Sequence, residues 1–193
     1  MALSLGLMGL WLAPSTATAQ AKLVIAPIVE KKVKQLPAGP LYWRVENFAT
    51  LAQAQAAAGP DSLAAEAAGK AWLFTLGPKG GSTPGGSKAA EIGPVPPFSA
   101  PEYLLRVNHA SGPPGAKTPV HSHPGSETFY ILSGRLEQKT PSGTMHVDAG
   151  QSMPGHKPGT TMQVSSNGKD DLDALVMFVV DATKPFSSAA KFK

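Results

Sequence analysis

The sequence contains no cysteine, which excludes both disulfide bonds and thiolate metal ligands. Charged residues are also few, at 16% of 193 residues, and the formal net charge is only +4. The lysines are scattered except for Lys31, Lys32 and Lys34, and no aromatic residues are interleaved with these three. Because a nucleic-acid surface needs a denser basic patch, no nucleic-acid partner is expected.

The sequence also lacks an apolar run that could span a bilayer near its start, because Ala2–Leu12 is too short. Ala17-Thr18-Ala19 follows this run and fits the small-x-small pattern of a signal-peptide cleavage site. We therefore expect residues 1–19 to be a signal peptide and the mature protein to be secreted or periplasmic, without a membrane segment. The charged region that usually precedes such a run is missing, and a buried N-terminal helix is the alternative.

Glycine and proline are abundant, with 20 and 19 residues, which favours short strands joined by tight turns. From residue 101 to residue 181, strand-like segments follow one another at close and regular spacing. Two stretches, 127–134 and 174–180, are apolar on both alternating faces, as expected of strands that are covered on two sides. The pattern predicts an all-β fold, an antiparallel sandwich or barrel.

Residues 20–100 are expected to form an N-terminal extension of strands and two short helices. Strand-like composition favours the strands, and alanine-rich stretches favour the helices. The strands are predicted over 41–48 and 70–77, and the helices over 48–59 with Asn47 as N-cap and over 62–69 with Asp61 as N-cap.

Three other segments are predicted to be irregular. Residues 22–40 are expected to be a flexible lead-in, and residues 182–193 a C-terminal tail. The glycine-rich segment 78–88 lacks the Gly-Lys-Ser/Thr order that binds phosphate and magnesium, so a surface loop is expected. Extra strands of the extension can pair within the chain or across a homodimer.

A cluster of possible metal ligands lies within seven positions. His121 and His123 are two residues apart, so their side chains would share one face of a strand. Pro124-Gly125 then allows a turn that can bring Glu127 opposite the two histidines. Two imidazoles and a carboxylate suit a divalent transition metal, Fe, Mn, Zn, Ni or Cu, and leave positions open for water or substrate.

The flanking glycines extend this cluster into a longer motif. Gly115, five residues, His121-x-His123, three residues, Glu127, six residues and Gly134 match the first signature motif of the cupin family without deviation. Residues 101–181 thus resemble a small single-domain cupin. The resemblance implies an antiparallel jelly-roll β-barrel with the metal ligands pointing into its mouth.

The second cupin motif is altered in this chain. Aligning Pro158-Gly159 with the proline-glycine turn of the family places Met162 where cupins usually carry a fourth ligand, a histidine. His156 lies six residues earlier, in the loop that enters this strand. Three alternatives stay open: His156 completes the site, water completes it, or the Met162 thioether ligates, which would favour copper.

Two classes of function are compatible with this pattern. The first is a metal-dependent enzyme acting on a small organic molecule, either a dioxygenase-like oxidoreductase or an isomerase, in which Glu127 ligates the metal or acts as a base. The second is a non-catalytic cupin of the cell envelope that binds or senses a small molecule. The complete first motif favours the enzyme, and the altered second motif favours the binding protein. Neither motif identifies the substrate.

Overall fold

The computed structural model describes residues 21–193. The predicted signal peptide therefore lies outside the described residues. Within residues 21–193 the chain forms antiparallel β-sheets and one short α-helix. None of the helices in this range is long and apolar enough to cross a membrane.

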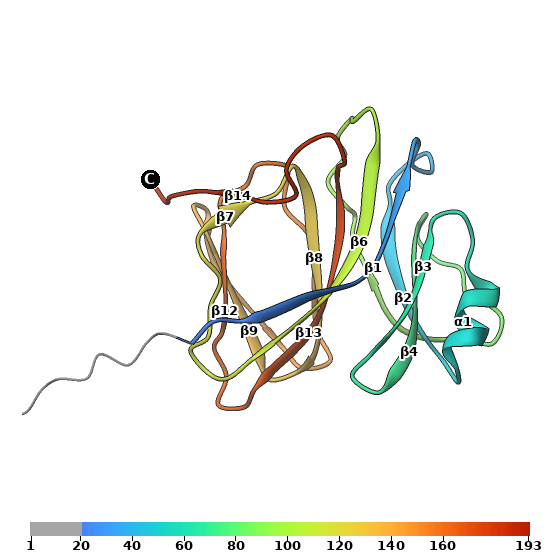
Figure 1. The fold of residues 1–193 in the computed structure, drawn as a ribbon, viewed down its shortest axis with the longest axis horizontal. Coiled ribbons are helices and arrows are strands. Elements are labelled where there is room, and N and C mark those ends of the chain that lie inside the picture. Colours follow the sequence, from blue (N-terminus) through green and yellow to red (C-terminus); the bar gives the residue numbers. More distant parts are fainter. Residues whose placement is uncertain (1–20) are drawn as a thin grey trace, which may run out of the picture.

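A five-stranded antiparallel sheet forms one wall of the predicted jelly roll (Figure 1). Its strands, in spatial order, are β1 (Val24–Val33), β6 (Tyr103–Gly112), β13 (Leu172–Asp181), β8 (Gly125–Ser133) and β11 (Ser152–Met153). Residues 24–33 thus belong to a strand, and the expected flexible lead-in is wrong over this range. The reason is that β1 pairs with β6 over nearly its whole length, which satisfies its backbone groups on that side.

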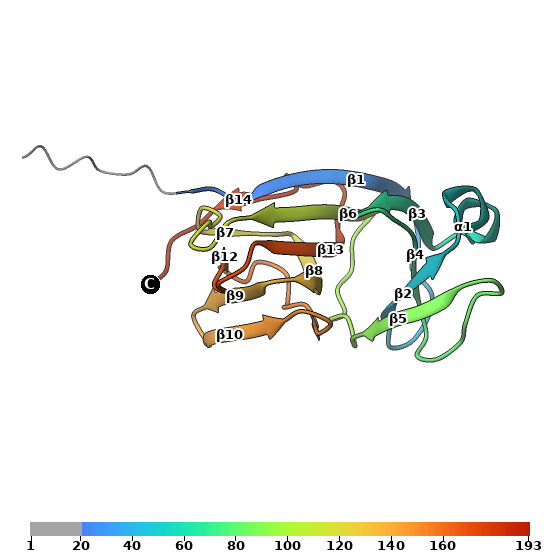
Figure 2. The same ribbon diagram turned by 90° about the horizontal axis from the view of Figure 1, so that it is seen from below.

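The opposite wall consists of two smaller sheets (Figure 2). One contains, in spatial order, β10 (Gly143–Asp148), β9 (Arg135–Thr140) and β12 (Gln163–Ser166). The other pairs β7 (His121–Ser122) with β14 (Ser188–Ala189). The apolar interior between the walls is formed by buried residues from both, among them Phe129, Leu136, Val147, Val164, Val176 and Phe178.

A four-stranded sheet, built by the N-terminal extension and called the second sheet below, packs against the outer face of the five-stranded sheet (Figure 2). It contains, in spatial order, β3 (Ser62–Ala67), β4 (Lys70–Gly77), β2 (Tyr42–Phe48) and β5 (Ser87–Ile92). On β13, Val176 and Phe178 face the barrel interior, whereas Leu175 and Met177 face the second sheet. The predicted covering of this strand on both faces is confirmed.

The helix α1 (Leu51–Ala57) covers the other face of the second sheet, and it confirms one of the two predicted helices. Its N-cap is Thr50, whose hydroxyl oxygen accepts a hydrogen bond from the Gln53 amide at 3.2 Å. The predicted cap, Asn47, is wrong because β2 continues through it to Phe48.

The second predicted helix is wrong, because residues 62–67 form β3. Burial there alternates with a period of two, with Leu63, Ala65 and Ala67 buried. The turn after β3, at Ala68 and Gly69, has positive φ at both residues, as in a two-residue hairpin. Pairing with β4 therefore overrides the helical preference of alanine.

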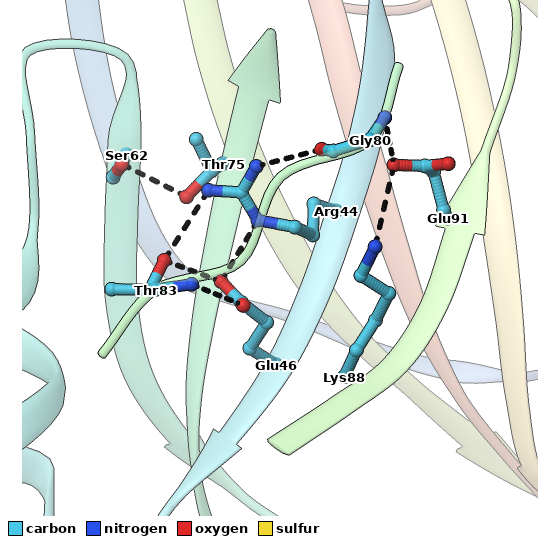
Figure 3. A network of polar contacts seen from close by, with 8 residues as sticks. All are labelled: Arg44, Glu46, Ser62, Thr75, Gly80, Thr83, Lys88 and Glu91. Atoms are coloured by element: carbon cyan, nitrogen blue, oxygen red, sulfur yellow. Dashed lines mark hydrogen bonds and ion pairs between the residues drawn. The ribbon is translucent and has the colours of Figure 1, made fainter. Parts of the chain in front are cut away.

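The glycine-rich loop between β4 and β5 is held to the second sheet by a buried ion pair (Figure 3). Glu46 is fully buried, accepts hydrogen bonds from the amide and hydroxyl of Thr83, and pairs with Arg44 at 3.0 Å. Burial alone would raise the pKa of Glu46, but the bonds from Thr83 and Arg44 hold it below its ordinary value. A Cβ atom on Gly81 would lie 2.9 Å from the Arg44 guanidinium, so a glycine allows the loop to approach this closely.

Candidate metal centre

Two neighbouring segments place the three candidate ligands. His121 lies in β7, and its backbone forms two hydrogen bonds with Met162 at 2.8 and 2.9 Å. Glu127 lies in β8, which starts at Gly125. A Cβ atom on Gly125 would lie 2.1 Å from the Val179 carbonyl oxygen, so only glycine lets the chain turn this close to β13.

The turn brings His121, His123 and Glu127 together. One ligand atom from each residue can be chosen so that all three lie within 4.8 Å of one another. The imidazole centroids are 4.9 Å apart with an 84° angle between the rings, and His123 Nε2 is 3.9 Å from Glu127 Oε1. This spacing is compatible with a single ion between the three side chains.

Both histidines are oriented by hydrogen bonds from their Nδ1 atoms to backbone carbonyl oxygens. His121 Nδ1 is 2.9 Å from the Pro119 carbonyl oxygen, and His123 Nδ1 is 2.7 Å from that of Phe186. A carbonyl oxygen can only accept, so each Nδ1 carries the hydrogen. Each Nε2 is then left with a free lone pair for a metal, the arrangement that metal-binding histidines commonly show.

Two atoms of the cluster are buried and have no hydrogen-bond partner among the described residues, His123 Nε2 and Glu127 Oε2. Leaving buried polar atoms without partners costs about 1–3 kcal/mol each. A cation between the three side chains would give both atoms a partner. The donor set and these two unpaired atoms therefore fit a divalent metal.

Burial shifts both of these groups toward their neutral forms. It lowers the pKa of His123 to about 4, although the bond to the Phe186 carbonyl acts in the opposite direction. It also raises the pKa of Glu127 to about 8. His123 is therefore neutral at pH 7, as a metal ligand must be, while Glu127 would release a proton when a cation binds.

The cluster opens into a mainly apolar cavity of about 380 Å³. The walls come from β6, β8, β12 and β13, from residues near the start of β1, and from the C-terminal segment. The apolar lining residues include Ile25, Phe129, Val164, Val176, Phe178 and Phe186. Such a cavity can hold a small organic molecule beside the cluster.

The C-terminal segment, expected to be a tail, closes one side of this site. In Figure 1, β14 lies beside β7 at one end of the barrel. The ring of Phe186 packs against His123 and Phe178, with centroid distances of 4.9 Å to each. The Arg106 guanidinium stacks on the same ring at 4.2 Å and is ion-paired with Glu30, so it helps to hold Phe186 in place.

The structure does not bring His156 into the cluster. Its Nε2 is 2.7 Å from Oε1 of Gln138, and burial lowers its pKa. The amide of the same Gln138 donates to the sulfur of Met162 at 3.3 Å. Both candidates for the fourth ligand are thus bonded to one glutamine.

Two residues of the site were missed in the sequence. Phe186 lies in a segment without strand or motif character, and its contact with His123 spans 63 residues. Asn108 is buried and lines the cavity from β6. No sequence signal identified it, because the same strand also carries the polar residues Arg106 and His109.

The comparisons with known proteins concern the barrel. A protein-family model described as "Cupin domain" matches residues 109–178, a range that contains His121, His123 and Glu127. No curated protein matches the chain.

Several solved structures resemble part of the chain. A conserved protein with a double-stranded β-helix domain from Klebsiella pneumoniae is 25% identical, with a TM-score of 0.39, over 45% of this chain and 75% of its own. A cupin 2 conserved barrel protein from Salinispora arenicola is 20% identical, with a TM-score of 0.36, over 41% and 65% of the two chains. The polyketide cyclase RemF from Streptomyces resistomycificus is 18% identical, with a TM-score of 0.39, over 46% and 62%.

Proposed function

Residues 109–178 form a cupin domain, and from this premise we propose that the protein is a metal-dependent enzyme of the dioxygenase-like kind. It holds a divalent transition metal with His121, His123 and Glu127 and acts on a small organic molecule in the adjoining cavity. The observation that carries this proposal is the convergence of three ligand atoms within 4.8 Å beside a cavity of about 380 Å³.

In this proposal the histidines bind the metal and the cavity walls hold the substrate. His121 and His123 present their Nε2 atoms because Pro119 and Phe186 accept the hydrogens on Nδ1. The apolar walls bury the substrate and exclude water from the reacting atoms. A metal bound there would supply open coordination positions, at which substrate and oxygen are polarised or activated.

The composition of the cavity favours oxygen chemistry over isomerisation. Apart from His121, His123 and Glu127, none of the described residues that line it carries a titratable side chain. An isomerase that moves protons needs a positioned acid or base in addition to its metal. If Glu127 binds the metal, no lining residue of the described part is left for that role.

The first experiment measures metal content in untagged protein purified without chelators. We expect one transition-metal ion per chain in the wild type and less than a tenth of that in His121→Ala and His123→Ala. His146→Ala is the matched control, because this histidine is exposed on β10 and lies apart from the cluster. Full metal content in both cluster variants would overturn the assignment of the site.

The second experiment measures oxygen consumption by the iron-loaded protein with catechols, thiols and diketones. Substrate-dependent oxygen uptake that disappears in His121→Ala would support the dioxygenase-like activity. Stoichiometric metal without turnover of any of these compounds would contradict it.

A non-catalytic binding protein is the second candidate function. The observation that favours it is Met162 at the position where cupins usually carry a histidine. In addition, the imidazole of His156 is hydrogen-bonded to Gln138 and does not join the cluster. A reactive site that has lost a usual ligand is compatible with a metal that only holds a small molecule. Ligand binding by the metal-loaded protein without turnover would distinguish this function from the first.

A further inference from the structure

The cavity beside the metal cluster is lined by a buried polar side chain, outside the cluster, that has an atom without a hydrogen-bond partner among the described residues. Asn108 lines it from β6, and only 4% of this residue is exposed. Its Oδ1 atom is buried and has no hydrogen-bond partner among the described residues. Since a buried carbonyl oxygen without a partner is costly, a hydrogen-bond donor on a bound molecule would stabilise it.

The surroundings of Asn108 give it no structural partner. In the register of the sheet, Asn108 lies beside Val176 of β13, which lies beside Phe129 of β8. Both neighbours are apolar and line the same cavity. Thr118, by contrast, is a buried polar residue of this cavity that is satisfied, because its hydroxyl bonds to the backbone of Val164 at 3.0 and 3.4 Å.

The same register gives the distance between Asn108 and the cluster. Glu127 lies beside Phe178, which lies beside Arg106, so Asn108 is two strands and two residues away from Glu127. With a strand spacing of about 4.8 Å and a rise of about 3.4 Å per residue, their Cα atoms are about 12 Å apart. Both side chains extend into the cavity, which leaves room between their polar ends for a molecule about the size of one ring.

We infer that Asn108 is a specificity-determining residue that accepts a hydrogen bond from the substrate. The inference rests on the proposed function and names its substrate class. That class is a small, largely apolar molecule. One end carries an oxygen atom that can bind the metal, and the other end carries a hydroxyl or N–H group that can donate a hydrogen bond to Asn108.

Two probes of equal size test this inference on the zinc-loaded protein. 4-Hydroxybenzoate and 4-methylbenzoate share a carboxylate that can bind the metal, and only the first carries a donor at the far end. Calorimetry should show that the wild type binds 4-hydroxybenzoate about fivefold more tightly, the ratio expected of one neutral hydrogen bond. Equal affinity for the two probes in the wild type would overturn the inference.

Variants of Asn108 assign the preference to this side chain. Asn108→Leu and the smaller Asn108→Ala should both lose the preference while keeping zinc. Thr118→Val is the matched control, because it removes a hydroxyl from the same cavity that is already bonded to the backbone; it should keep the preference. A preference that persists in both Asn108 variants would contradict the inference, as would failure of both variants to fold, which would make Asn108 a structural residue.

Zinc content separates this inference from the proposed function. If the wild type binds no zinc, the proposed metal site fails, and Asn108 has no metal-bound substrate to select. If it binds zinc but neither probe, the metal site stands and the substrate class is wrong. The melting temperature of the metal-free protein gives a second readout, because replacing an unpaired buried amide by leucine should raise it.

Discussion

His123 and Phe186 are joined by a hydrogen bond of 2.7 Å, although they are 63 residues apart in the chain. The bond runs from the imidazole Nδ1 to the backbone carbonyl of Phe186, and the Phe186 ring packs against the same imidazole. The C-terminal segment therefore orients a candidate metal ligand and also covers it.

Removing this segment should weaken metal binding. Deletion of residues 185–193 removes the carbonyl that fixes the orientation of the His123 ring. Loss of such an orienting hydrogen bond typically lowers metal affinity by about 10–100-fold. Deletion of residues 191–193 is the control, since it leaves β14 and the Ala190–Val120 hydrogen bond in place. Zinc competition titrations measure the metal affinity of the two truncated proteins. Equal affinities would show that the C-terminal segment does not support the site.

The metal-free protein should lose stability as the pH rises from 6.5 to 8. The raised pKa of Glu127, about 8, keeps it protonated in the folded state while the unfolded state releases the proton near its ordinary value of 4.5. The lowered pKa of His123, about 4, acts in the opposite direction, and this effect is complete about one pH unit above its unfolded value of 6.5. The glutamate dominates over this range, and the net free energy of unfolding falls by about 1 kcal/mol between pH 6.5 and pH 8.

Chemical denaturation of chelator-treated protein at several pH values measures this loss. Glu127→Gln is the control, because it keeps the shape of the side chain and cannot ionise. If the free energy of unfolding of Glu127→Gln still fell with rising pH, the effect would belong to another group.

Replacing His156 should leave metal affinity nearly unchanged. Its Nε2 is 2.7 Å from Gln138 Oε1, and it does not belong to the three-residue cluster. We therefore expect His156→Ala to bind zinc within about twofold of the wild type, whereas His121→Ala loses the ion. A tenfold or larger loss in His156→Ala would make this histidine the fourth ligand.

The candidate ligands could be predicted from the sequence because their information is local, whereas the jelly-roll fold was expected only from the resemblance that their motif carries. His121 and His123 are two residues apart, and the turn at Gly125 fixes where Glu127 returns. The close approach of Gly125 to Val179 explains in physical terms why a glycine stands between the histidines and the glutamate. A short stretch of sequence thus carries both the ligands and the geometry that brings them together.

The features that were missed depend on contacts between distant parts of the chain. Residues 62–67 have helical composition, but their strand conformation is set by pairing with β4. The role of Phe186 depends on its backbone carbonyl, which no residue type reveals. Asn108 becomes conspicuous only when β13 and β8 place apolar side chains around it.

The groups that orient both histidines belong to the main chain, at Pro119 and Phe186. Point mutations at these two positions change a side chain and leave the accepting oxygen in place. The tautomers of His121 and His123 are therefore protected against sequence drift at these positions. Insertions or deletions before β7 or after β13 shift the accepting oxygens themselves, so evolution should tolerate changes of residue type there more readily than changes of loop length.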